Sequence, residues 1–186
     1  MQPESPLALR NDEELMVLVD EDDRVVGAES KLAAHRSGAL HRAFSVIVWD
    51  RAGRQLLQRR HARKYHSGGL WTNACCGHPR PGEDVAAAAL RRLEEEMGFA
   101  CKLESLGTIL YRAEIDSGMI EHELVHVFRG LYEGPVAPDA AEVEDYRWTR
   151  LEALRADIAA EPQAFTVWFR QYVAAQWPMV LALPGA

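Results

Sequence analysis

The residues of this chain that are best suited to chemistry lie in one short stretch, residues 73–99. The stretch opens with the sequence NACCGHP, in which Cys76 precedes His78 by two positions, and it continues into a charged run that includes Arg92 and Glu96. A thiol with its ordinary pKa of about 8.5 is protonated at neutral pH and can donate a proton. Imidazole and carboxylate groups together suit a zinc or manganese ion. The stretch therefore combines proton transfer, metal binding and anion binding.

A second candidate site is the tripeptide Glu121-His122-Glu123. Because side chains alternate along a strand, Glu121 and Glu123 point to one face, which they share with Val125 and Val127. Two neighbouring carboxylates repel each other unless a cation lies close to both. Carboxylates on an otherwise apolar face therefore favour a metal site over a solvated strand edge. The histidines that could complete this site are His35, His41 and His78.

The pattern of β-branched and aromatic residues predicts the strands that must position these side chains. They are expected over residues 15–19, 25–29, 43–49, 54–60, 103–113 and 120–132, with a turn at 116–118 inside the last hairpin. Residues 61–72 form a basic, glycine-containing loop.

One helix is expected between the strands at 54–60 and 103–113, and two more are expected at the end of the chain. Residues 84–97 have helical spacing, and Gly98 supplies the C-terminal stop. Arg92 and Glu96 share one face of this helix. A capping box at Thr149 and Glu152 predicts a helix through residue 160, and residue 162, a proline, suits the first turn of a last, aromatic helix. The buried stripe of the first helix is expected to consist of Ala86, Leu90, Leu93 and Met97.

Composition limits the class of protein. A chain of 186 residues with 48% hydrophobic residues suits one domain, which we expect over residues 15–178 with tails at 1–14 and 179–186. The net charge of −7 disfavours a nucleic-acid partner. No apolar run approaches the roughly 20 residues that span a bilayer, and the start lacks the pattern of a signal peptide. Three cysteines without a CxxC pair indicate a reducing compartment, so we expect a cytoplasmic protein that does not bind membranes.

The charged run resembles the Nudix box. The residues in register with that family pattern are Gly77, Glu83, Arg91, Leu93, Glu95, Glu96 and Gly98. Arg92 stands where the family has a glutamate, so one metal-binding carboxylate is replaced by a cation. The resemblance implies the α/β class and a Nudix-fold α/β/α sandwich with a mixed sheet and additional N- and C-terminal elements.

Residues 73–79, Arg92 and Glu121-His122-Glu123 together are similar to the type I isopentenyl diphosphate isomerase family, over roughly residues 15–177. This resemblance implies a metal-dependent 1,3-proton shift, through a tertiary carbocation, between isopentenyl and dimethylallyl diphosphate in isoprenoid biosynthesis. The implied partner is a small C5 diphosphate, with the protein acting as a monomer or weak dimer.

The same resemblance implies a role for each candidate residue. Cys76 matches the catalytic cysteine, Glu123 the opposing acid/base, Tyr111 the tyrosine that assists it and Trp168 the aromatic residue facing the cation. Glu96 matches the carboxylate that binds a magnesium ion arriving with the substrate diphosphate. The implied ligands of one divalent metal, Mn, Zn or Mg, are His35, His41, His78, Glu121 and Glu123. The implied cations around the diphosphate are Lys31, Arg60, Lys64 and Arg92.

Some alternatives stay open from the sequence. The spacing from His35 to His41 is one residue shorter than the family pattern, which could displace His41. Cys75 is interpreted as a small buried hydrophobe, although a structural zinc site formed by Cys75, Cys76 and His78 is a further option. The competing functions are a Nudix hydrolase of a nucleoside diphosphate compound and a non-catalytic module that binds isoprenoid diphosphates.

Overall fold

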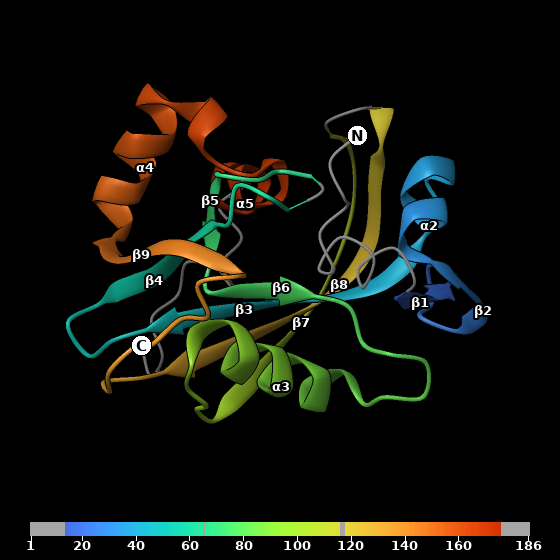
Figure 1. The fold of residues 1–186 in the computed structure, drawn as a ribbon, viewed down its shortest axis with the longest axis horizontal. Coiled ribbons are helices and arrows are strands. Elements are labelled where there is room, and N and C mark those ends of the chain that lie inside the picture. Colours follow the sequence, from blue (N-terminus) through green and yellow to red (C-terminus); the bar gives the residue numbers. More distant parts are fainter. Residues whose placement is uncertain (1–13, 65, 116–117, 176–186) are drawn as a thin grey trace, which may run out of the picture.

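The structure is a computed structural model that describes residues 14–64, 66–115 and 118–175. Within these residues, nine strands form one mixed sheet, with α3 on one side and α4 and α5 on the other (Figure 1). In chain order the elements are β1 (Leu15–Val19), β2 (Val25–Ser30), α2 (Lys31–Ser37), β3 (His41–Trp49), β4 (Arg54–Arg60), β5 (Trp71–Asn73), β6 (Cys75–Gly77), α3 (Val85–Met97), β7 (Leu103–Glu114), β8 (Ile120–Leu131), β9 (Val143–Arg150), α4 (Leu151–Ala160), the 3-10 helix η2 (Pro162–Ala164) and α5 (Val167–Ala174).

Strand β3 is the centre of the sheet. It pairs in parallel with β8 along its whole length, and it pairs antiparallel with β1, β6 and β4. Ser45 of β3 is the partner of both Cys76 on β6 and Val127 on β8. Because a strand has two edges, β6 and β8 flank β3 from opposite sides. The hairpin partner β7 extends the sheet beyond β8, and β5 and β9 extend it beyond β4.

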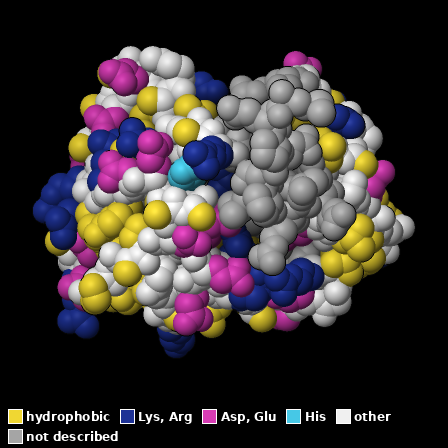
Figure 2. Space-filling view, in the orientation of Figure 1, with side chains coloured by type: hydrophobic (Ala, Val, Ile, Leu, Met, Phe, Trp, Pro, Cys, Tyr) yellow, Lys and Arg dark blue, Asp and Glu magenta, His cyan; other side chains and the backbone are white. Residues whose placement is uncertain are grey.

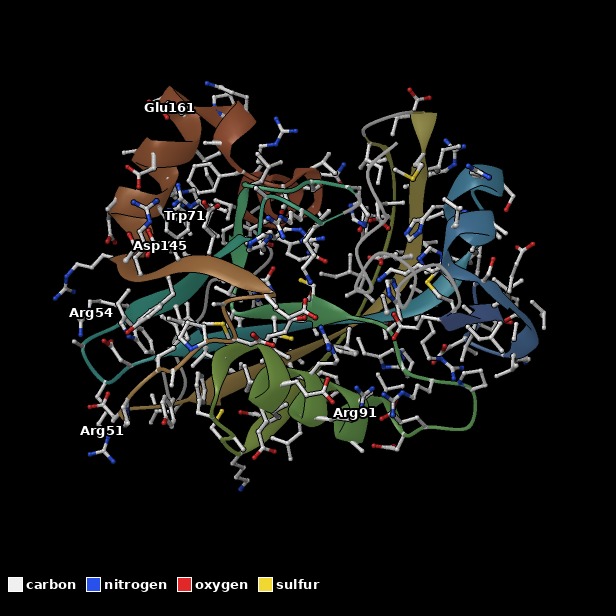
Figure 3. The ribbon with its side chains drawn as sticks, in the orientation of Figure 1. Arg51, Arg54, Trp71, Arg91, Asp145 and Glu161 are labelled. Atoms are coloured by element: carbon white, nitrogen blue, oxygen red, sulfur yellow. The ribbon has the colours of Figure 1, made fainter. Side chains whose placement is uncertain are left out.

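Alternation along the strands separates two apolar cores. On one face, Trp49 and Val125 pack with Phe169 and Tyr172 of α5, and Figure 3 shows Trp71 on this side of the sheet. On the other face, Phe44 and Val46 pack with the helix α3. The sandwich expected from the sequence is therefore confirmed. One face of β3 packs against α5 and the other against α3.

Helix α3 begins and ends as the sequence predicts, but the predicted buried stripe is wrong at two positions. The side chain of Asp84 accepts a hydrogen bond from the backbone N–H of Ala87, and Gly98 ends the helix in the left-handed conformation. Leu93 and Met97 are buried, whereas Ala86 is exposed and the side chain of Leu90 is 38% exposed. Ala88 and Ala89 face the sheet in their place. Because residues 86–89 are all alanine, the sequence does not show which side of this helix faces the sheet.

The C-terminal helices differ from expectation in their first turns. Arg150 is the N-cap of α4 and makes no side-chain capping bond, while the hydroxyl of Thr149 donates to the backbone O of Arg150; the predicted capping box is therefore absent. Pro162 begins the short helix η2, not the aromatic helix α5. The sequence missed α2, β5, β6 and β9, which are too short or too polar to show a clear period.

Parts of two expectations fall outside the described residues: the turn at 116–117, and most of the tails over 1–14 and 179–186. None of the helices in the described part of the chain has both the length and the apolar character that crossing a bilayer requires. On the face drawn in Figure 2, basic and acidic side chains are interspersed rather than gathered in one basic field, outside the grey atoms.

Candidate active site

Three pairs of adjacent strand residues build the site. His41 of β3 is the partner of Glu123 of β8, and Tyr111 of β7 is the partner of the same glutamate. Ser45 of β3 is the partner of Cys76 of β6. Directly paired residues point to the same face of a sheet, so these side chains all face the side that α5 covers. There Ser45, Cys76, Tyr111 and Glu123 border a cavity of about 570 Å³.

A short helix brings a further histidine to this face. α2 ends at Gly38, which has a φ of 69° and turns the chain back into β3. His35 in its last turn thereby comes to lie with its ring centroid 5.1 Å from that of His41, and His41 lies 5.1 Å from His78. The shortened spacing between His35 and His41 does not displace His41 from the cluster.

The ring orientations leave one nitrogen of each histidine for a cation. Nδ1 of His35 lies 2.8 Å from the backbone O of Lys31, and Nδ1 of His41 lies 2.9 Å from that of Ala39. A carbonyl only accepts, so both Nδ1 atoms carry hydrogen. Nε2 of His35 then faces a carboxylate oxygen of Glu121 at 3.0 Å. Two acceptors at this distance require a proton or a metal ion between them.

Nearby donor atoms fit a divalent metal ion. Nε2 of His41 is buried and has no hydrogen-bond partner among the described residues. The ligand atoms of His35, His41 and His78 lie within 4.8 Å of one another, as do those of His41, Glu121 and Glu123. Imidazole nitrogens and carboxylate oxygens converging in a buried site are the ligands that zinc and manganese take. The residues present therefore fit the expected metal.

Electrostatics keep Glu123 ionised within this cluster. Burial alone raises the pKa of its carboxyl group, but the neighbouring imidazoles of His41 and His78 outweigh burial and hold that pKa well below its usual range. One oxygen lies 2.9 Å from Nε2 of His78, and the other accepts the hydroxyl of Tyr111 at 2.7 Å. Burial raises the pKa of Tyr111 well above its ordinary value, so this hydroxyl stays a donor. Glu123 is thus a fixed carboxylate at the cavity wall.

Metal binding at this cluster is expected to stabilise the folded protein. An ion that binds only the native state at about 100 times its Kd adds about 2.7 kcal/mol to the free energy of unfolding, which corresponds to about 5 to 10 °C in Tm for a chain of this size. The measurement is thermal unfolding of the chelated protein with and without added Zn²⁺ or Mn²⁺. The H78A variant should show a much smaller shift, and equal Tm values with and without metal in the unmodified protein would contradict the site.

Cys76 is held as a thiol by its neighbours. The side-chain amide of Asn73 donates to the backbone O atoms of Val46 and Cys75, each at 3.0 Å. Its Oδ1 is therefore left as an acceptor, and it lies 3.1 Å from Sγ of Cys76. Burial raises the pKa of the Cys76 thiol to about 11. The sulfur thus carries a hydrogen at neutral pH.

The aromatic wall of the cavity belongs to the same hydrogen-bond network. Nε1 of Trp168 donates to Oγ1 of Thr72 at 3.0 Å, and this hydroxyl donates to Oδ1 of Asn73 at 3.1 Å. The indole and the thiol of Cys76 are thereby fixed relative to each other. Cys75 points to the other face of β6 and is fully buried against α3, which confirms its interpretation as a small hydrophobe. Of these two neighbouring cysteines, Cys76 is the one that lines the cavity.

Basic side chains gather at the end of the cavity nearest α3, each close to a carboxylate. Arg92 pairs with Glu96 on the next turn of α3 and lies 3.6 Å from Glu142. Lys64 pairs with Glu142 as well. Gln58 donates to the second carboxylate oxygen of Glu96 at 2.9 Å. Basic and acidic side chains together at one end of the cavity suit an anionic group that arrives with its own metal ion.

Two further basic residues that line the cavity are Lys31 and Arg60. Nζ of Lys31, at the start of α2, lies 3.6 Å from a carboxylate oxygen of Glu14. The guanidinium of Arg60 lies 5.5 Å from the ring centroid of Trp168.

The structure brings the predicted site residues together. Those that line the cavity are Lys31, Arg60, Lys64, Cys76, His78, Arg92, Glu96, Tyr111, Glu121, Glu123 and Trp168. His35 and His41 lie behind them, fully buried. Sequence reasoning missed several polar residues that contact this set, because nothing in their local pattern marks them. Among them are Ser45, Gln58, His66, Glu142 and Tyr172.

Comparison with protein families places residues 39–169 in the NUDIX domain model. The chain is 55% identical over 157 residues to an isopentenyl-diphosphate Delta-isomerase of Burkholderia multivorans, covering 84% of this chain and 89% of that protein. It is 51% identical to isopentenyl-diphosphate Delta-isomerase 1 of Aromatoleum aromaticum, covering 84% of this chain and 88% of that protein.

Solved structures show the same fold. A Deinococcus radiodurans protein superposes with a TM-score of 0.74 at 20% identity, covering 88% of this chain and 99% of that chain. The MutT protein of Methanosarcina mazei superposes with a TM-score of 0.60 at 20% identity, covering 73% of this chain and 91% of that chain. At this identity the likeness concerns the fold alone.

Proposed function

The chain belongs to the NUDIX family and, within it, to the isopentenyl-diphosphate Delta-isomerases, and on this premise we propose that it interconverts isopentenyl diphosphate and dimethylallyl diphosphate, a step of isoprenoid biosynthesis. The reaction moves a carbon–carbon double bond by one position. A proton is added at one end of a three-carbon unit and another is removed from the far end.

One observation carries the proposal: a thiol and a carboxylate approach one cavity from opposite edges of the same strand. Cys76 lies on β6 and Glu123 on β8, on either side of β3, and both line the cavity. A 1,3-proton shift needs an acid and a base that reach different carbons of one substrate at the same time. Metal-assisted hydrolysis of a diphosphate compound by water does not require such a thiol.

The proton steps follow from the states of these groups. The S–H of Cys76 gives its proton to the terminal alkene carbon, which leaves a tertiary cation on the neighbouring carbon and a thiolate on the sulfur. Ser45 lies 3.3 Å from that sulfur and can donate to the thiolate. The carboxylate of Glu123 then takes a proton from the carbon on the other side of the cation, and the new double bond forms. Tyr111 holds that carboxylate in place through its hydroxyl.

The cationic intermediate is stabilised by the wall of the cavity. The π face of a tryptophan attracts a desolvated cation by roughly 2 kcal/mol, and Trp168 is 96% buried and fixed through its indole N–H. The buried indole also keeps water from that side of the carbocation. Trp168 is therefore assigned to cation stabilisation as well as to core packing.

The metal assignments are part of the proposal. His35, His41, His78, Glu121 and Glu123 would hold a divalent ion, which would supply a fixed positive charge that keeps Glu123 ionised and oriented. Glu96, with Gln58 against its second oxygen, would hold the magnesium ion that accompanies the diphosphate. The cations that would contact the diphosphate oxygens are Lys31, Arg60, Lys64 and Arg92.

The test is turnover in deuterated water. Incubating the metal-loaded protein with isopentenyl diphosphate should give dimethylallyl diphosphate that carries deuterium, with no phosphate released. The rival Nudix hydrolase predicts orthophosphate or nucleotide release from a panel of nucleoside diphosphate compounds. A lack of deuterated C5 product would refute the isomerase. Binding of the diphosphate without any turnover would instead support a non-catalytic module that binds isoprenoid diphosphates.

Replacing Arg92 by glutamine should weaken substrate binding more than it slows the chemistry. A hydrogen bond to a charged group contributes about 1.5 to 3 kcal/mol, so KM is expected to rise about 10- to 100-fold with kcat changed only a few-fold. Arg91 is the matched control, because it pairs with Glu83 and Glu95 away from the cavity and lies on the same helix (Figure 3). R91Q should lower the unfolding midpoint and leave KM unchanged. An unchanged KM in R92Q would remove Arg92 from the diphosphate site.

A further inference from the structure

We propose that His66 supplies an additional imidazole ligand to the divalent ion of the histidine–glutamate centre, beyond the five ligands assigned above. The inference rests on that centre and deepens the proposed function. His66 lies in the loop between β4 and β5, has no role among the residues assigned above, and lines the same cavity.

Position is the first argument. Glu121 turns one carboxylate oxygen toward Nε2 of His35 at 3.0 Å and the other toward Nε2 of His66 at 3.6 Å. The ligand atoms of these three residues lie within 4.8 Å of one another. The ring of His66 lies 5.5 Å from that of His35 by centroids. His66 therefore joins the cluster at Glu121, whereas His41 and His78 turn toward Glu123.

The distance between donor atoms favours coordination over a hydrogen bond. A separation of 3.6 Å between Nε2 of His66 and the Glu121 oxygen is too long for a hydrogen bond. Two donor atoms held about 2.1 Å from one ion lie roughly 3.0 to 3.6 Å apart for angles of about 90° to 120° at the ion. The observed separation is that of two ligands sharing a metal.

The loop is built to hold this side chain. His66 is 94% buried, and its ring packs edge-on against Trp168 at 6.0 Å. Arg60 donates to its backbone O at 3.4 Å. The next residue, Ser67, has a φ of 51°, a conformation that costs a non-glycine residue energy and is held only where surrounding structure requires it. A Cβ at Gly68 would lie 2.5 Å from the backbone O of Ala62, so the loop closes tightly beneath His66.

The consequence is a preference among metals. Each added imidazole favours borderline ions such as Zn²⁺ and Co²⁺ over Mg²⁺, which prefers oxygen ligands. With His66 the centre has four imidazole and two carboxylate side chains. Removing one of the imidazoles should therefore weaken Zn²⁺ and Co²⁺ binding more than Mn²⁺ or Mg²⁺ binding.

The experiment measures metal binding by the chelated full-length protein, without substrate. Zn²⁺ affinity is obtained by competition with a chromophoric chelator, and bound Co²⁺ reports its coordination through its visible absorption. H66A and H66Q are expected to bind Zn²⁺ about 10- to 100-fold more weakly and to change the Co²⁺ spectrum. The matched control is H61A, a histidine of the same loop whose Nδ1 only accepts from the backbone N–H of Arg63, and it should match the unmodified protein.

The outcomes separate this inference from the proposed function. Zn²⁺ affinities within twofold of the unmodified protein and an unchanged Co²⁺ spectrum in both His66 variants would overturn the inference, whatever the isomerase activity. Absence of Zn²⁺ and Co²⁺ binding by the unmodified protein would overturn it as well. Failure of the deuterium test with His66-dependent metal binding would refute the isomerase and leave the ligand assignment standing. Circular dichroism of the chelated variants confirms that each is folded.

Discussion

Replacement of Cys76 by alanine or serine should lower kcat for isopentenyl diphosphate by about 10³- to 10⁴-fold, the upper part of the range for loss of a general acid. Alanine removes the proton donor. Serine keeps a donor, but its alkoxide is far less stable than a thiolate. KM should change only a few-fold, because the hydrogen-bond partners of the sulfur are Ser45 and Asn73 and not the basic residues that would hold the diphosphate. The measurement is kcat and KM from deuterium incorporation, with diphosphate binding measured by calorimetry.

The neighbouring cysteine is the control for this prediction. Cys75 is fully buried against α3 on the opposite face of β6, so C75A should retain turnover and lose on the order of 1 kcal/mol of stability from the small cavity. Turnover by C76A close to that of the unmodified protein would show that another group donates the proton. Loss of diphosphate binding in C76A would indicate a structural role instead of a chemical one.

Local patterns in the sequence predicted much of the fold because they are strong where the elements are long. β1 and β4 match their predicted bounds, and α3 ends at its predicted last residue and begins one residue after its predicted first. α2 is different, because its seven residues are too few to show a helical period. β9 was missed because charged residues occupy half of its positions. Such elements exist because tertiary packing holds them, which no local pattern reports.

The site could be predicted as a set of residues but not as an arrangement. The resemblance supplied His35 and Glu123, yet only the register between β3 and β8 sets His41 beside that glutamate. Ser45 contacts the thiol of Cys76 because their strands pair, and a serine inside an apolar strand gives no local signal. His66 lies in a loop read only as basic and glycine-containing. Residues that act through long-range pairing are invisible to spacing along the chain.

Replacement of Glu123 by glutamine should lower kcat at least about 10³-fold even when the metal site is saturated. Glutamine has nearly the same shape, so the cavity should be preserved, but an amide cannot accept the substrate proton at neutral pH. Zn²⁺ affinity should also fall, because the neutral amide replaces a carboxylate that lies 2.9 Å from Nε2 of His78 and accepts the hydroxyl of Tyr111. Measuring kcat at increasing Zn²⁺ concentration separates the two effects.

Glu121 is the control for this prediction, because it lies on the same face of β8 as Glu123 but contacts different residues. Its oxygens face His35 and His66, and in the proposal it binds metal without exchanging a proton with the substrate. E121Q should therefore weaken Zn²⁺ binding and regain most of its turnover as Zn²⁺ is raised, whereas E123Q should not. Recovery of both variants to the same level would mean that Glu123 acts only as a ligand, and the base of the reaction would then have to be sought elsewhere on the cavity wall.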